Sequence, residues 1–435
     1  MLILLDVMKR KIWIANIILM LCFAPLSGIT LDSCSIRARN NYPLIKQYGL
    51  IEKTRDYNLS NISKAWLPQV SLGMKATYQS DVTEIPTSLG NAISAITGKP
   101  FSMPSLDKDQ YQAVMDVNQL IWDGGVIRSQ KRSMEVSAEI DKQKTEIDLY
   151  ALNERIHQLY FGIMLLNEQI VLQDILLDEM TANHKKVLSL VENGIALPSD
   201  GDAIKVEMIQ AKQRIYDLRS TQKNYCLILS SFTGLEINEK TPLEKPVAAE
   251  PVEAINYRPE LKLFAAQQLL LSNQEKALHA SNLPKISAFV QGGYGRPGLN
   301  MFTTDFSPFY IGGIRLSWNL SNFYSLKSNL GKIELNRQQI EVMKETFLFN
   351  NTLERNQHQT EINKLRENLK SDDEIISLRK NIKTTAEARL SNGTITVTDL
   401  LREINSEYMA RQQKALHEIQ LLMAIYQLKT NTNNL

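Results

Sequence analysis

The chain has 435 residues, of which 43% are hydrophobic and 22% are charged. Its formal net charge is +2 at pH 7, so it lacks the basic excess of a nucleic-acid-binding protein, and nucleic acid is excluded as a partner. Only 14 prolines and 19 glycines occur, so long stretches of the chain can be helical.

Residues 1–28 have the pattern of a secretory signal peptide. Three cationic residues at 9–11 precede a short apolar run, and small residues follow at a cleavage site that ends at Gly28. The alternative is an uncleaved membrane anchor, but the run is shorter than the ~20 apolar residues of a spanning helix. No later continuous apolar stretch predicts a spanning helix. In an oxidising compartment Cys34 and Cys226 could form a disulfide.

The second half of the chain repeats the order of motifs in the first half. The segments 42–46, 66–71 and 193–200 return about 200 residues later as 258–262, 282–287 and 392–399. Each copy is predicted to contain a helix, a pair of strands, a very long helix, a turn and a shorter return helix. The predicted segments are helix 29–66, strand pair 67–123, long and return helices 124–240, linker 241–256, helix 257–283, strand pair 284–321, and long and return helices 322–435.

Four segments alternate apolar and polar residues, which is typical of strands with one apolar face. They are 70–81, 111–122, 286–294 and 310–320, paired through the loops 82–110 and 296–309. Each is about 10 residues long, which is the length of a tilted strand that crosses a bilayer. Soluble hairpins with one buried face would show the same pattern. Because the smallest membrane barrels have about eight strands, the membrane interpretation requires several chains to pool their strands.

Two heptad seams of apolar residues predict long coiled-coil helices. The first seam comprises Leu149, Leu152, Ile156, Leu159, Ile163, Leu166, Ile170, Gln173, Leu177, Met180, His184, Val187 and Val191. The second comprises Ile204, Met208, Ala211, Ile215, Leu218, Gln222, Tyr225, Leu229 and Phe232. A single helix over 126–191 would be on the order of 100 Å long at 1.5 Å per residue. The second copy repeats the pattern more loosely over 325–390 and 398–429.

The signal peptide, the duplicated plan, the paired Asn-Gly…Asp turns and the opening segment 31–43 together resemble the TolC-type outer-membrane efflux channel family. The resemblance implies a fold that is mainly α with transmembrane β, built from a duplicated helix–β-hairpin–long-helix unit. Each chain would contribute four strands to a trimeric twelve-stranded β-barrel, continuous with a twelve-helix α-helical coiled-coil tunnel in the periplasm. The implied location is the outer membrane of a Gram-negative bacterium.

The function implied by the resemblance is a passive exit duct of a tripartite efflux or type I secretion system, with no enzymatic activity and no cofactor. Its implied partners are two further copies of the chain, outer-membrane lipid, a periplasmic adaptor protein, and an inner-membrane pump of the RND, ABC or MFS type. The competing hypothesis is a secreted coiled-coil scaffold or adhesion rod with soluble β-hairpins.

The turns between long and return helices have local signals for helix ends. Gly194 and Gly393 suit left-handed C-caps, and Ser199 and Thr398 suit the N-caps of the return helices. By resemblance these turns form the periplasmic entrance of the channel. The residues expected to face the adaptor are Gly194, Ile195, Ala196, Leu197, Gly393, Thr394 and Ile395.

Two aspartates at these turns have both a local and a functional interpretation. Asp200 and Asp399 fall in a first helical turn, where the helix dipole favours an anion. By resemblance, three copies of each would instead ring the entrance, concentrate cations and contribute to gating. Where entrances of the family often have further gating residues, this sequence has Ile395, Leu390 and Arg402, which leaves the gate bonding and the cation selectivity open.

Other motifs do not predict chemistry. Residues 293–298 match the pattern G-x-G-x-x-G, but a dinucleotide site needs a helix directly behind it, and here more strand follows. The segment is therefore predicted to be a loop at the end of a strand. The histidines have no metal-binding spacing, and no serine or cysteine lies in a recognisable nucleophile motif, so no metal site and no enzyme are predicted.

Overall fold

The structure is a computed structural model that describes residues 28–84, 86–101, 106–247, 256–300 and 303–433. The chain divides into two compact units. Unit 1 comprises Met1–Lys46, Thr145–Leu261 and Glu345–Leu435, and unit 2 comprises Gln47–Lys144 and Lys262–Lys344. The predicted signal peptide lies outside the described residues apart from Gly28.

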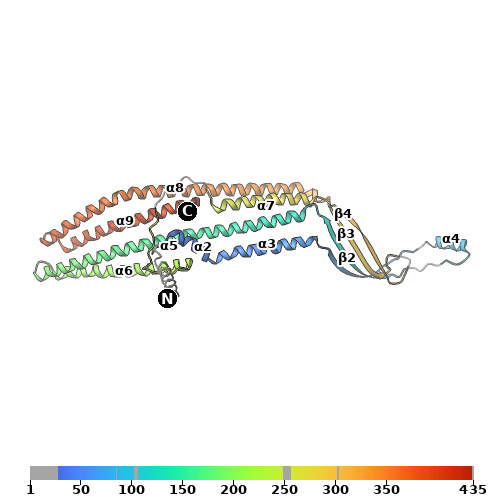
Figure 1. The fold of residues 1–435 in the computed structure, drawn as a ribbon, viewed down its shortest axis with the longest axis horizontal. Helices are drawn as coiled ribbons and strands as arrows, with labels where there is room; N and C mark the ends of the chain where they lie inside the picture. The colour runs from blue at the N-terminus through green and yellow to red at the C-terminus, as the bar shows by residue number, and fades with distance from the viewer. Residues whose placement is uncertain (1–27, 85, 102–105, 248–255, 301–302, 434–435) are drawn as a thin grey trace, which may run out of the picture. The chain divides into compact units, whose positions relative to one another are not determined.

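Unit 2 contains one antiparallel sheet in the order β1-β2-β3-β4 (Figure 1). Its strands are β1 (Gln69–Tyr78), β2 (Asp109–Trp122), β3 (Lys285–Arg296) and β4 (Ser307–Ser317). All four predicted strands are confirmed, and the pairing of β2 with β3 joins the two predicted hairpins into one sheet. The register shifts between Leu120 and Trp122, so the chain has an irregularity where the alternation of the sequence slips. Residues 293–298 run from the end of β3 into a loop, as predicted.

Unit 2 also contains helices that precede, separate or follow the strands along the sequence. They are α3 (Gln47–Ser63), the 3-10 turn η2 (Lys64–Trp66), α4 (Thr87–Thr97), most of α7 (Pro259–Ser281), and the first parts of α5 (Val126–Glu192) and α8 (Asn322–Ser391). Val136 and Ile140 of α5 pack with Ala266 of α7. Helix α4, which was not predicted from the sequence, interrupts the predicted loop 82–110.

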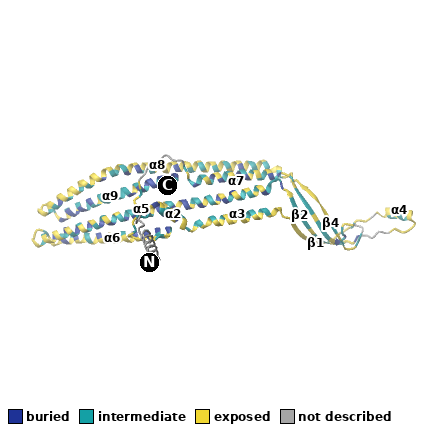
Figure 2. Ribbon diagram, viewed as in Figure 1, coloured by how far each residue is buried: buried dark blue, intermediate teal, exposed yellow. Residues whose placement is uncertain are grey.

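Unit 1 contains the two helical hairpins. The remainders of α5 and α8 turn into α6 (Pro198–Thr233) and α9 (Val397–Thr432), and α2 (Leu31–Asn41) and the 3-10 turn η1 (Pro43–Lys46) complete the unit. With 67 and 70 residues, α5 and α8 confirm the predicted long helices. Figure 2 shows buried and exposed residues alternating along all four helices.

The two predicted seams are the packed faces of α5 and α6. Every seam position is buried or half-buried. Two of the three polar residues in the seams have hydrogen-bond partners: Gln173 accepts a hydrogen bond from the Tyr408 hydroxyl, and Gln222 donates one to Asn167. A buried amide without a partner would cost roughly 1–3 kcal/mol, so these pairs allow polar residues inside an apolar seam.

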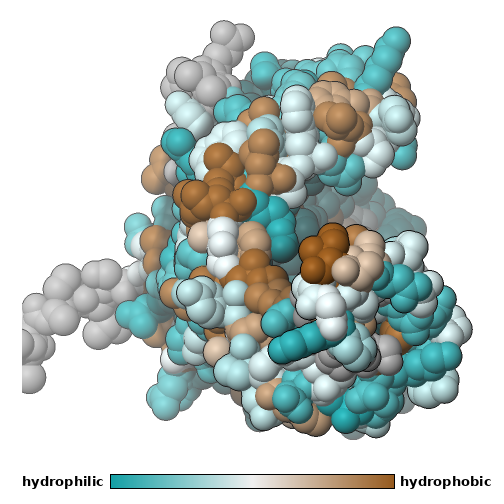
Figure 3. Space-filling view, turned by 90° about the vertical axis from the view of Figure 1, so that its right-hand side faces the viewer, coloured by the Kyte–Doolittle hydropathy of each residue, from teal (hydrophilic) through white to brown (hydrophobic). Residues whose placement is uncertain are grey.

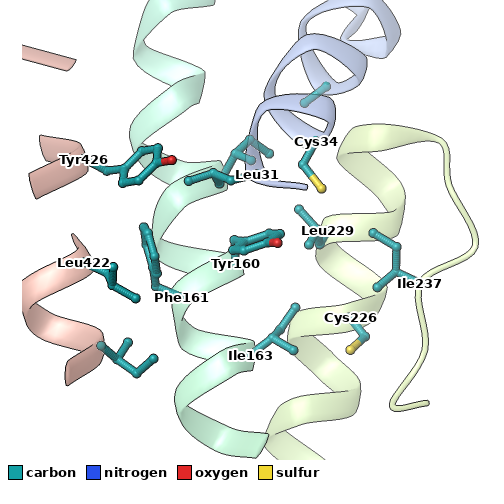
Figure 4. Packing of buried hydrophobic residues seen from close by; sticks show 13 residues of the cluster. Leu31, Cys34, Tyr160, Phe161, Ile163, Cys226, Leu229, Ile237, Leu422 and Tyr426 are labelled. Carbon is teal, nitrogen blue, oxygen red and sulfur yellow. The ribbon is translucent and has the colours of Figure 1, made fainter. Parts of the chain in front are cut away.

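The largest core cluster of unit 1 joins four helices (Figure 4). Tyr160 and Phe161 of α5 lie at its centre, and the Tyr160 hydroxyl oxygen is 2.6 Å from the carbonyl oxygens of Ile29 and Glu244. Cys34 of α2 and Cys226 of α6 belong to the same cluster as buried free thiols, so the disulfide considered from the sequence is not formed. Burial raises the pKa of the Cys34 thiol to about 11.

Helix α5 has one stretch that is long and apolar enough to cross a membrane by length and composition only. The core helix of a soluble protein passes the same test. The seam of α5 packs on α2, α6 and α9 in the core of unit 1, which accounts for its seam residues, while 39% of the apolar stretch as a whole is buried.

Candidate functional site

The register of the sheet sorts its side chains onto two faces, because cross-strand partners point to the same side. One face, called here the apolar face, has polar residues only near its ends, and these are Gln119, Asp109 and Arg296. The charged groups of Asp109 and Arg296 are 2.5 Å apart. Its other members are Val70, Leu72, Met74, Ala76, Tyr78, Tyr111, Ala113, Met115, Val117, Ile286, Ala288, Val290, Gly292, Tyr294, Pro308, Tyr310, Gly312, Ile314 and Leu316.

The opposite face of the sheet, called the polar face, carries the charged residues Lys75, Asp116, Lys285 and Arg315. Asp116 lies opposite Ser71 of β1 and opposite Gln291 of β3. A few apolar side chains also lie on this face, and one of them, Phe289, has the Arg315 guanidinium 4.6 Å from its ring centre. The face is therefore suited to water, whereas the apolar face is not.

The apolar face is exposed. The exposed fractions are 80% for Met74, 81% for Tyr310 and 74% for Ile314. Figure 3 looks onto the end of the molecule that carries α4 and shows patches of hydrophobic side chains bordered by hydrophilic ones. Soluble monomers rarely expose a continuous apolar surface of this extent, so the face is a candidate contact with lipid or with protein.

The sheet also has two open edges. Within the described residues, β1 and β4 each pair with one strand only, so their outer backbone groups have no strand partner. An open edge is a template for pairing with a further chain, and isolated sheets of this kind are normally blunted or closed.

The two helical tips, defined as 190–204 and 389–403, are built alike. Gly194 and Gly393 have φ of +71° and +67°, so both predicted left-handed caps are confirmed. At the first tip the Gly194 N–H donates to Val191 O and the Ile195 N–H to Leu190 O. The corresponding bonds at the second tip run from 393 to 390 and from 394 to 389. This is the Schellman pattern, which satisfies the last carbonyl groups of a helix.

The N-caps of the return helices differ from the prediction. Ser199 and Thr398 lie inside the first turns, because α6 begins at Pro198 and α9 at Val397. Proline is favoured at the first helical position, which places the N-cap of α6 at Leu197. The N-cap of α9 is Thr396, two residues before the predicted one.

Asp200 and Asp399 both close these caps from the third helical position. The Asp200 carboxylate accepts the Leu197 N–H at 2.9 Å, and the Asp399 carboxylate accepts the Thr396 N–H at 3.1 Å and its hydroxyl at 2.7 Å. These hydrogen bonds from Thr396, with a weaker contribution from Arg402, hold the pKa of Asp399 below its usual value. The local interpretation of both aspartates thus has a direct structural basis.

Replacing Gly194 or Gly393 by alanine is expected to destabilise the local tip by about 1–2 kcal/mol, because an L-residue is strained at positive φ. No atom lies within 4 Å of a Cβ added at either position, so the cost is in the backbone alone. Gly331, which has helical backbone and equally free space, is the matched control, and its replacement by alanine is expected to stabilise α8 by about 0.5–1 kcal/mol. Hydrogen exchange of the amides around each substituted site measures the difference, and equal effects at the three sites would contradict it.

The remaining predicted entrance and adaptor residues fall into two groups. Leu390 and Ile395 are half-buried against the core cluster of the tips, which includes Val187, Ile204 and Leu400. The exposed or partly exposed group comprises Gly194, Ile195, Ala196, Leu197, Gly393, Thr394 and Arg402.

The exposed apolar side chains are concentrated at the first tip. Ile195 is 61% exposed and Leu197 is 66% exposed, whereas the corresponding positions of the second tip hold Thr394 and Thr396. Arg402 lies 3.6 Å from Asp399 and 3.3 Å from Glu403, and the position that corresponds to it at the first tip is Ala203. The two tips therefore share a backbone but differ in charge and apolar exposure.

A group of charged side chains near the tips, called here the buried charge cluster, was not predicted from the sequence. The Lys383 ammonium of α8 lies 2.6 Å from Glu179 of α5 and 2.5 Å from Glu407 of α9, and Arg411 lies 2.6 Å from Glu407. Burial alone would raise the pKa of Glu407, but hydrogen bonds from Lys383 and Arg411 hold it below its usual value. A signal was present, because Glu407 continues the apolar stripe of Leu400 and Ile404 at helical spacing.

No protein-family model matches the sequence, and no curated protein matches it either. Solved structures do match its fold. The outer membrane protein VceC of Vibrio cholerae has 13% identity and a TM-score of 0.67, covering 92% of this chain and 95% of that one. The CmeC outer membrane channel of Campylobacter jejuni has 12% identity and a TM-score of 0.66, with 94% and 86% covered. The open state of the MtrE outer membrane channel of Neisseria gonorrhoeae has 13% identity and a TM-score of 0.64, with 92% and 88% covered.

The chain thus has the fold of the outer-membrane channels. The fold that the TolC-type resemblance implied for a single chain is confirmed over nearly its whole length, in its mostly helical body and its small antiparallel sheet. At 12–13% identity this likeness establishes the fold alone.

Proposed function

We propose that the protein is a passive exit duct in the outer membrane of a Gram-negative bacterium, serving a tripartite efflux or type I secretion system. The observation that carries the proposal is the exposed apolar face on a sheet whose two edges are open. In water this face and these edges would be unfavourable, whereas in a bilayer an apolar outer face beside a polar inner face is the barrel pattern.

The proposed assembly is a trimer. Four strands cannot close a barrel, but three chains that pair β1 of one copy with β4 of the next would close twelve strands and leave no edge. The polar face would then line the lumen. The long helices of three chains would form the wall of a twelve-helix tunnel in the periplasm, and the duct would work without chemistry or a cofactor.

The proposed partners at the tips are a periplasmic adaptor and, through it or beside it, an inner-membrane pump. Exposed Ile195 and Leu197 give the first tip an apolar surface that a protein partner would cover. The second tip, with exposed Thr394, would bind the adaptor mainly through polar contacts.

Membrane fractionation followed by mass measurement and planar-bilayer recording tests the proposal. A duct stays with the outer membrane through salt and carbonate washes, is solubilised by detergent as a trimer, and conducts ions. A secreted scaffold or rod, the competing hypothesis, would be released by the washes and would not conduct. A monomeric, water-soluble protein would rule out the duct.

Neutralising the aspartates at the tips is expected to weaken block of the single-channel current by divalent cations. Asp200→Asn should weaken the block several-fold, and Asp399→Asn less, because Arg402 already lies 3.6 Å from the Asp399 carboxylate. Asparagine keeps the size of the side chain at the helix cap, and alanine at both sites is the comparison. If block is unchanged in the double variant, the carboxylates act only as caps, while the duct itself is unaffected.

A further inference from the structure

Unit 2 contains a cavity of about 1000 Å³ at the junction between the strands and the helices. It lies between the turn from β2 to α5, the C-terminal end of α7, and the segment from β4 to α8. This volume is at the upper end of the range of about 300–1000 Å³ that is usual for ligand pockets. The residues that line it include three cations and two aromatic residues: Arg128, Lys131, Lys276, Trp318 and Phe323.

One wall of the cavity continues the apolar face of the sheet. Trp318 follows Leu316 of that face by two residues, and its ring packs edge-on against Phe323 with 6.5 Å between the ring centres. The Trp318 Nε1–H donates to the carbonyl oxygen of Asn282 at 2.9 Å. Aromatic side chains with one polar atom are enriched where a membrane meets water, so this wall suits the interface of the bilayer.

Another wall carries an excess of positive charge. Arg128 and Lys131 of α5 and Lys276 of α7 line the cavity and form no ion pair with any described residue. Arg132 also lines the cavity but is paired with Glu135 at 2.9 Å. Unpaired cations that converge on one cavity favour an anionic ligand.

Two buried amides line the same cavity without using all their hydrogen-bonding groups. Asn273 is 5% exposed and Asn282 is 6% exposed. The Asn273 Nδ2 and the Asn282 Oδ1 are fully buried and have no hydrogen-bond partner among the described residues. Both atoms are inaccessible to a water-sized molecule, so these amides belong to the wall of the cavity and do not contact a ligand in it.

We propose that the cavity binds a glycerophospholipid with an anionic headgroup, an inference that rests on the membrane location proposed above. The phosphate lies among Arg128, Lys131 and Lys276. The acyl chains extend from the cavity past Trp318 and Phe323 and lie along the apolar face of the sheet. Basic pockets between helices next to a bilayer recognise lipid headgroups in this way.

Native mass spectrometry of the detergent-purified protein, mixed with equal amounts of phosphatidylglycerol and phosphatidylcholine, tests the proposal. Preferential retention of phosphatidylglycerol is expected, and Arg128→Gln with Lys276→Gln should reduce it about tenfold or more. The matched control is Lys53→Gln with Lys332→Gln, which removes the same charge from exposed positions outside the cavity. Equal retention of the two lipids, or an equal loss in the control, would overturn the proposal.

A further measurement separates the lipid site from a simple anion site. Inorganic phosphate in millimolar amounts should not displace the lipid, and displacement would show a simple anion site instead.

The conductance of the same variants distinguishes this inference from the proposed function. The double variant Arg128→Gln/Lys276→Gln should still conduct, since its substitutions are far in sequence from the tips and off the strands. A wild-type protein that conducts but shows no lipid preference overturns the lipid site alone. A wild-type protein that does not conduct overturns the duct, whatever lipid it retains.

Discussion

Replacing Glu407 by alanine is expected to lower the local stability of the helical tips by about 3–5 kcal/mol. The Glu407 side chain is 4% exposed and lies between the cations of Lys383 and Arg411, at 2.5 Å and 2.6 Å. Its removal leaves the Lys383 ammonium, itself 14% exposed, with Glu179 alone. Breaking a buried pair costs more than the pair contributes, because the remaining charge stays desolvated.

Hydrogen exchange of the amides over 400–411 measures this effect as a free energy of local opening. The control is Lys370→Ala, because Lys370 and Glu367 form a pair in which both side chains are 71% exposed, and a change within about 0.5 kcal/mol is expected there. Replacing Glu407 and Lys383 together by leucine and methionine should cost less than Glu407→Ala alone. If Glu407→Ala matches the exposed control, the cluster is solvated in the assembled protein.

The pH dependence of this contribution follows from the direction of two pKa shifts. The pKa of Glu407 is lowered from 4.5, so its contribution is complete above that value and is lost as the pH falls through the lower pKa of the folded protein. The pKa of Lys383 is raised from 10.5, so its contribution is complete below that value and is lost as the pH rises through the higher pKa of the folded protein. The cluster therefore stabilises the tips across the whole neutral range.

Elements with a long, regular period could be predicted from the sequence. The seam of α5 shows its period over 149–191, and each position of that seam is buried or half-buried in the structure. The strands were predicted for the same reason, since alternation over about ten residues leaves few other interpretations. Helix α4 was missed because its eleven residues fall in a segment expected to be a loop.

Features that depend on partners distant in the sequence could not be predicted. The pairing of β2 with β3 joins residues more than 150 positions apart, and nothing local specifies it. The buried charge cluster takes Glu179, Lys383 and Glu407 from three helices. Glu407 stands out because it continues an apolar stripe, but nothing local in the sequence pairs it with Lys383 or places Glu179 beside that lysine.

The N-caps differ from the prediction for local reasons. Pro198 favours the first helical position, which places the N-cap of α6 at Leu197. At α9 two threonines suit the cap, and Thr396 is the one that forms a capping box with Asp399.

Replacing Leu72 by arginine is expected to destabilise the membrane-inserted protein by about 2–4 kcal/mol per chain, the cost of a cation near the bilayer midplane. Leu72 is 70% exposed in the single chain, and its row on the apolar face continues through Met115, Gly292 and Tyr310 near the middle of the strands. A water-exposed face would tolerate the same change within about 0.5 kcal/mol. The free energy of folding into lipid vesicles, measured by urea titration, therefore shows directly whether this face contacts lipid.

The neighbouring substitution Ser71→Arg is the matched control, because it places the same side chain on the polar face. Ser71 lies directly opposite Asp116, so an arginine there gains a cross-strand partner of opposite charge, and a neutral or slightly stabilising effect is expected. The same substitution should change the ion selectivity of the conductance, since the polar face would line the lumen. Equal costs for the two arginines would mean that the faces of the sheet do not have different surroundings, and the barrel arrangement would then be wrong.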